Sequence, residues 1–146
     1  MTGVHIAIGV AMVTVNLAAG ALGAWQWWRG IPGTLFWRLL RAGQALTVLA
    51  AADGLILVAL GDELPELHLI YGLTPIGVSF LAEQLRLASA DTVLQSRDLD
   101  DAQAMRGLPE AEQHAIVHQI VRRELGVMAI SALVVGVLGL RAGGWL

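Results

Sequence analysis

A single carboxylate, Asp53, lies within the stretch 42–60, which carries no other charge. An ionisable side chain inside an apolar helix costs about 2.5–3.5 kcal/mol, so it should face other helices and have a partner. Counting inward at about 1.5 Å per residue puts Thr74 at the depth of Asp53, Tyr71 one turn nearer the surface and His68 close to it. We therefore predict a polar pocket of Asp53, His68, Tyr71 and Thr74, where an ionised Asp53 could take up a proton or cation. The alternative is one buried hydrogen-bonded pair that fixes helix register.

Pro75 lies inside the same apolar stretch as Tyr71 and Thr74. A proline within a helix frees the carbonyl four residues earlier, here that of Tyr71, and tends to kink the helix. A neutral Asp53 could donate a hydrogen bond to that carbonyl. The acid on one helix is therefore expected beside a weakened turn of the next.

Two histidines, His114 and His118, are four residues apart, with Glu110 and Arg122 continuing the same spacing. Imidazoles at this spacing share one helix face, a geometry that metal sites use. However, the glutamate of a His-Glu-x-x-His motif is missing, and Arg122 would repel a cation. We interpret the face as a solvated or partner-facing stripe, so these histidines are weak metal candidates and no metal is predicted.

The other two histidines, His5 and His68, are both expected near one membrane surface. A haem b or copper site between them is a conceivable alternative. The chain has no cysteine, which excludes disulfides, thiolate metal sites and covalent haem attachment. No cofactor is predicted.

The distribution of charge predicts the elements that position these groups. Only 14% of the residues are charged, about half the usual share. Four stretches (4–25, 42–60, 67–82 and 125–140) hold one charge between them, and each approaches the roughly 17–25 residues of a membrane-spanning helix. A soluble bundle would need a polar stripe that the first stretch lacks, and a cleaved signal peptide would need a basic start. We predict an all-α polytopic membrane protein, one domain over 1–146, with a bundle of four transmembrane helices at about 4–28, 38–60, 65–90 and 109–141.

Arginine placement predicts the orientation. Eight of the nine arginines lie in or beside the first and third connections, whereas the second connection has three acids and no arginine. By the positive-inside rule the first and third connections are cytoplasmic, so both termini are outside and the third, about 88–124, is a helical cytoplasmic segment. Tryptophans are expected as anchors at the two interfaces: Trp25, Trp27, Trp28 and Trp37 inside, and Trp145 outside. We predict a multi-pass protein of the bacterial plasma (inner) membrane.

Small and polar residues predict how the helices pack in lipid. Asn16 shares a helix face with small residues and is expected to hydrogen-bond to Thr47 or Ser79 at its depth. Gly54 and Gly136 each have an alanine four residues earlier and are expected at close helix contacts.

Several runs of the chain from residue 37 onward resemble a family of four-helix integral membrane proteins from high-GC actinobacteria. The runs are Trp-Arg-Leu-Leu-Arg-Ala-Gly-Gln at 37–44, Leu-His-Leu-Ile-Tyr-Gly-Leu-Thr-Pro at 67–75, Ala-Glu-Gln-Leu-Arg at 82–86 and Val-Arg-Arg-Glu-Leu-Gly-Val-Met at 121–128. The resemblance implies a four-helix membrane fold and brings no assigned activity. A fainter likeness to the four-helix units of haem A synthase and cytochrome b561 comes from His68, which opens a helix, although no second histidine lies inside the membrane.

Three classes of function fit these features. The net charge of −3 gives no basic surface for nucleic acid, and no motif specifies a reaction, which favours a non-enzymatic role. We expect an accessory, assembly or interaction subunit of a membrane complex, with the lipid bilayer and other copies or subunits as partners. The alternatives are a proton- or cation-coupled small carrier that works as an oligomer through Asp53, and a haem- or quinone-binding redox protein.

Overall fold

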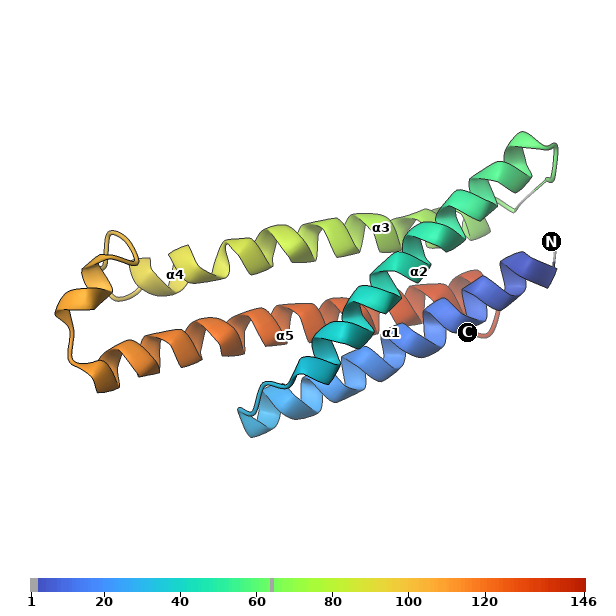
Figure 1. Cartoon of the computed structure of the whole chain (residues 1–146). Coiled ribbons are helices and arrows are strands. Elements are labelled where there is room, and N and C mark those ends of the chain that lie inside the picture. Colours follow the sequence, from blue (N-terminus) through green and yellow to red (C-terminus); the bar gives the residue numbers. More distant parts are fainter. Residues whose placement is uncertain (1–2, 64) are drawn as a thin grey trace.

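The computed structural model describes residues 3–63 and 65–146, and every regular element in these ranges is helical (Figure 1). Proline and glycine set several of the boundaries. Pro65 and Pro109 directly precede the third and the last helix, and Gly30 and Gly61 adopt positive φ angles of 68° and 100° in the turns. The elements are α1 (Gly3–Arg29), α2 (Thr34–Ala59), α3 (Glu66–Leu87), α4 (Ser89–Gln95), the 3-10 helix η1 (Ala104–Gly107) and α5 (Glu110–Ala142).

The helices form two antiparallel pairs, α1 with α2 and α3 with α5. The contact between α1 and α5 joins the two pairs at the centre. α1 packs against α2 and α5, and α3 packs along α5, whereas α2 and α3 contact each other much less (Figure 1). Both described ends of the chain lie at the same end of the bundle as the turn between α2 and α3.

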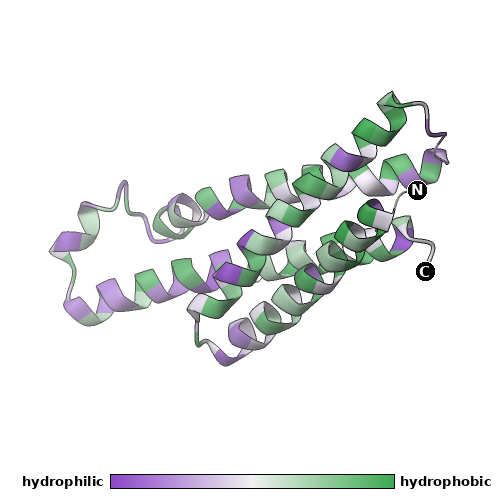
Figure 2. Cartoon of the chain, turned by 45° about the vertical axis from the view of Figure 1, so that its right-hand side comes forward, coloured by the Kyte–Doolittle hydropathy of each residue, from purple (hydrophilic) through white to green (hydrophobic). Residues whose placement is uncertain are grey.

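Three helices, α1, α2 and α5, are long and apolar enough to cross a membrane. Hydrophobic residues predominate along these helices, and hydrophilic residues are most frequent at the end of the molecule that carries α4 and η1 (Figure 2). The chain is therefore an all-α protein with membrane-spanning character. α3 has no stretch of comparable length that is as apolar as those of α1, α2 and α5, and its 22 residues include His68, Thr74, Pro75 and Ser79.

Glycines bring α1 and α5 into close contact. A Cβ added at Gly20 would lie 2.9 Å from the backbone nitrogen of Leu133, and one at Gly136 would lie 2.5 Å from Cδ2 of Leu17. Contacts this short leave room only for hydrogen, so these positions let the two backbones approach.

The connection between α3 and α5 folds back on the first turns of α5, and we call residues 88–120 the hairpin. The expected helix over 65–90 ends instead at Leu87, and the short α4 follows after Ala88. α5 is continuous over 33 residues, a length of about 50 Å, and extends beyond the other helices. Val93, Leu94 and Ile116 form a small core between α4 and the first turns of α5, separate from the core of the main bundle.

Candidate functional site

The partner of Asp53 is His5, on the neighbouring helix α1. Nδ1 of His5 lies 2.9 Å from Oδ2 of Asp53, and the two side chains are 12% and 27% exposed. Gly54 makes this approach possible, because a Cβ there would lie only 3.3 Å from Cε1 of the His5 ring. The small residue directly after the lone acid indicates a close helix contact in the sequence, but it does not specify which helix supplies the partner.

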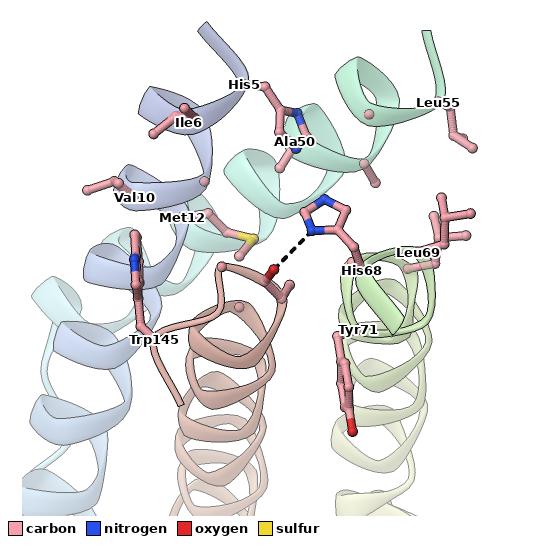
Figure 3. Close-up of a pocket in the computed structure, with 18 residues that line it drawn as sticks. His5, Ile6, Val10, Met12, Ala50, Leu55, His68, Leu69, Tyr71 and Trp145 are labelled. Atoms are coloured by element: carbon pink, nitrogen blue, oxygen red, sulfur yellow. Dashed lines mark hydrogen bonds between the residues drawn. The ribbon is translucent and has the colours of Figure 1, made fainter. Parts of the chain in front are cut away.

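His68 joins the same group from α3. Its Nδ1 lies 2.9 Å from the carbonyl oxygen of Ala142, the last residue of α5. The ring centroids of His5 and His68 are 5.8 Å apart with the planes tilted by 52°. Side chains and backbone from α1, α2, α3 and α5 therefore meet at one end of the bundle (Figure 3).

A pocket of about 300 Å³ opens beside the two histidines. Its walls are mostly aliphatic, and the imidazoles, Tyr71 and Trp145 supply its rings (Figure 3). Ligand pockets in proteins have this character, with an apolar wall and a few polar groups that orient the ligand. Its principal lining residues are Val10 and Met12 of α1, Ala51 and Leu55 of α2, and Leu69 and Leu73 of α3, and we call the whole cavity the outer pocket.

The four residues predicted as a polar pocket are only partly together. His68 and Tyr71 line the outer pocket. Asp53 is not among the lining residues, and it is connected to the pocket through its hydrogen bond with His5. Thr74 does not line the pocket, because its hydroxyl donates to the carbonyl of Ile70 in its own helix at 2.6 Å. The guanidinium of Arg141 lies 5.8 Å from the Tyr71 ring centroid, over the ring.

Asn16 is buried and joins α1 to α2. Its Nδ2 donates to the carbonyl of Gly43 at 3.2 Å and lies 3.4 Å from the hydroxyl of Thr47. Ser79 does not take part and instead lines a shallow hollow between α2 and α3. Gly54 lies against His5, and Gly136 lies against Leu17.

The two histidines of the hairpin have separate surroundings. His114 is 78% exposed and lies 3.5 Å from Glu110, whereas Nε2 of His118 lies 3.3 Å from the carbonyl oxygen of Gly30. The second contact ties α5 to the turn between α1 and α2. Over residues 3–63 and 65–146, no group of three or more histidine, aspartate or glutamate side chains is placed to hold a metal ion.

A cluster at the opposite end of the bundle was not anticipated from the sequence. Glu83, one residue beyond the uncharged stretch 67–82, accepts hydrogen bonds from Arg41 and Gln44 of α2 and from Arg86 of its own helix, the last at 2.8 Å. Partial burial raises the pKa of Glu83, but the hydrogen bonds from Arg41, Gln44 and Arg86 outweigh it and lower the pKa from 4.5 to about 2. This cluster connects α2 and α3, which pack loosely elsewhere.

We expect Glu83→Gln to lower the stability of the protein in detergent by on the order of 1–2 kcal/mol at pH 7, because Arg41 and Arg86 lose their counter-charge. The folded pKa of Glu83 is lowered, so its contribution is complete above pH 4.5 and is lost as the pH falls toward 2. Thermal unfolding of both proteins at pH 7 and pH 3 should therefore show a smaller difference at pH 3. An equal difference at both values would contradict the role given to Glu83.

Comparisons of the chain with models of protein families, with curated proteins and with solved structures gave no match. The function is therefore argued from the site itself.

Proposed function

We propose that this chain is a multi-pass protein of the bacterial plasma membrane, in which α1, α2, α3 and α5 all span the bilayer with both termini outside. It acts as a non-enzymatic subunit that holds a small lipid-soluble ligand in the outer pocket. The observation that carries the proposal is this pocket, where helices from both antiparallel pairs enclose an apolar space beside two anchored imidazoles.

The packing of α3 supports a fourth span. α3 lies along α5, a helix apolar enough to cross the membrane, and its stretch 67–82 carries no charge. At about 1.5 Å per residue this stretch is near 24 Å long, and Arg86 just beyond it can reach the interface. The arginines of the Glu83 cluster lie at one end of this stretch, as the positive-inside rule expects of the cytoplasmic side.

The size and place of the outer pocket separate the candidate functions. About 300 Å³ is at the lower limit for ligand pockets, which suits a single small ring system better than a porphyrin. All of its lining residues belong to one end of the bundle, which supports binding rather than a path for ions across the membrane. Asp53 is also committed to His5, so the carrier alternative is the less favoured one.

The hairpin supports the second part of the proposal, a role as an interaction subunit. It extends past the bundle, has its own core at Val93, Leu94 and Ile116, and exposes charged residues on α5. A surface of this kind, rigidly continuous with a spanning helix, suits contact with another subunit or another copy of the chain on the cytoplasmic side.

The test uses two glycines of α3 that have no atom within 4 Å of an added Cβ, Gly72 in the outer pocket and Gly77 outside it. Gly72→Phe should fill the pocket, whereas Gly77→Phe adds the same ring to the lipid-facing side of the helix. We expect a small lipid-soluble molecule in solvent extracts of the purified native protein and of Gly77→Phe, but not of Gly72→Phe, when all three are analysed by mass spectrometry. No bound molecule in any of them, or the same amount in all three, would contradict the proposal.

A further inference from the structure

The hydrogen bond of His68 to α5 determines which of its ring nitrogens carries the proton. A carbonyl oxygen can only accept, so Nδ1 of His68 donates to Ala142 across 2.9 Å. Ala142 ends α5, and the last carbonyls of a helix have no partner within the helix. His68 thus satisfies a backbone acceptor, and this requirement fixes the Nδ1–H tautomer in the neutral ring.

The remaining nitrogen, Nε2, is then a hydrogen-bond acceptor at the outer pocket. Within the part of the chain that the structure describes, no group donates a hydrogen bond to Nε2. In the same residues, every buried side-chain nitrogen or oxygen has a hydrogen-bond partner, so an atom without one is exposed to solvent. Nε2 is therefore accessible. Figure 3 shows it on the side of the ring that faces His5, away from the bond to Ala142.

The part of the pocket wall that α3 forms does not supply the missing donor. The neighbours of His68 along α3 are Leu69, Gly72 and Leu73, which offer no side-chain polar atom, and the Tyr71 ring points away from His68 (Figure 3). A ligand that brings its own donor would satisfy this acceptor and gain one hydrogen bond. The rings of Trp145, His5 and His68 on the wall favour a flat aromatic body for that ligand.

From this arrangement, and resting on the proposed function, we infer that the ligand of the outer pocket is a lipid-soluble phenol or quinol whose hydroxyl donates to Nε2 of His68. The oxidised quinone has only acceptor oxygens and would place one of them against the lone pair of Nε2. The pocket should therefore select the hydroxyl form over any ring of the same shape that cannot donate. His5, held by Asp53, lies next to this position and forms the adjacent edge of the pocket.

The test compares two stable probes of matched shape, 1-naphthol and 1-methoxynaphthalene, which differ in the ability to donate. Binding to the purified chain is measured by titration calorimetry in one detergent, and Gly72→Phe gives the background from the micelles. We expect 1-naphthol to bind the native protein about three- to tenfold more tightly, the net value of one hydrogen bond.

His68→Asn separates the role of Nε2 from that of the bond to α5. The amide nitrogen of asparagine can still donate to the carbonyl of Ala142, but the variant has no group in the place of Nε2. We expect this variant to keep the thermal stability of the native protein and its affinity for 1-methoxynaphthalene, and to lose the preference for 1-naphthol.

The outcomes separate this inference from the proposed function. Equal binding of the two probes by the native protein, or a preference that persists in His68→Asn, would overturn the inference while leaving a ligand pocket in place. If neither probe binds above the Gly72→Phe background, the proposed function fails and the inference fails with it.

Discussion

Gly20→Ala is expected to destabilise the bundle by about 1–3 kcal/mol, although alanine favours a helix more than glycine does. The added methyl would lie 2.9 Å from the backbone nitrogen of Leu133 and 2.6 Å from its Cγ. A side chain can rotate away from such a contact, but a backbone atom cannot, so α1 and α5 must separate. Because α1 and α5 join the two antiparallel pairs, the separation weakens the packing between the pairs.

Two matched substitutions make this prediction specific. Gly9→Ala, on the same helix, meets nothing within 4 Å and is expected to be neutral or slightly stabilising. Gly136→Ala should fall between them, because its nearest neighbour is the movable side chain of Leu17 and the backbone there is 3.4 Å away. Thermal unfolding in detergent should rank the stabilities as Gly9→Ala, Gly136→Ala and Gly20→Ala in descending order. A Gly20→Ala protein as stable as Gly9→Ala would contradict the close packing of α1 and α5.

The ends of the long helices could be predicted from the sequence because apolar stretches and breakers act locally. The predicted starts at 4 and 109 and the predicted end at 141 each lie within one residue of the structure. The break at Ala88 is not marked by a proline or glycine, so the sequence does not indicate it. α2 begins at Thr34, before Arg38 and Arg41, because a helix can extend beyond its uncharged stretch.

The side-chain partners were harder to predict, because depth along a helix does not define which face a residue occupies. Asp53 and Thr74 were matched by depth, yet Asp53 bonds to His5, whose side chain reaches it next to Gly54. The depth along the helices also pairs Ser79 with Asn16, but Asn16 bonds instead to Gly43 and Thr47 of α2.

The Glu83 cluster is a second contact between helices that the sequence does not specify. Arg41 and Glu83 flank different apolar stretches, and no pattern in the sequence pairs them. Their contact depends on the packing of α2 beside α3 at this end of the bundle, which no local pattern encodes.

The number of times that the chain crosses the membrane depends on α3. If α3 spans the membrane, the hairpin around residue 100 is cytoplasmic and residue 146 is outside. If only α1, α2 and α5 cross, with the N-terminus outside, residue 100 is outside and residue 146 is inside. The outer pocket, which α3 and the end of α5 line together, favours the first arrangement.

Labelling of single cysteines distinguishes these arrangements directly, and the natural chain has no cysteine to interfere. Asp62→Cys, Asp100→Cys and Leu146→Cys place one thiol each at exposed positions in the turn after α2, in the hairpin and at the end of the chain. Intact cells are treated with a membrane-impermeant maleimide, and permeabilised cells show that each thiol can react. Four spans with both termini outside predict that Asp62→Cys and Leu146→Cys are labelled in intact cells and that Asp100→Cys is labelled only after permeabilisation. Labelling of Asp100→Cys in intact cells, with Leu146→Cys protected, would contradict the account.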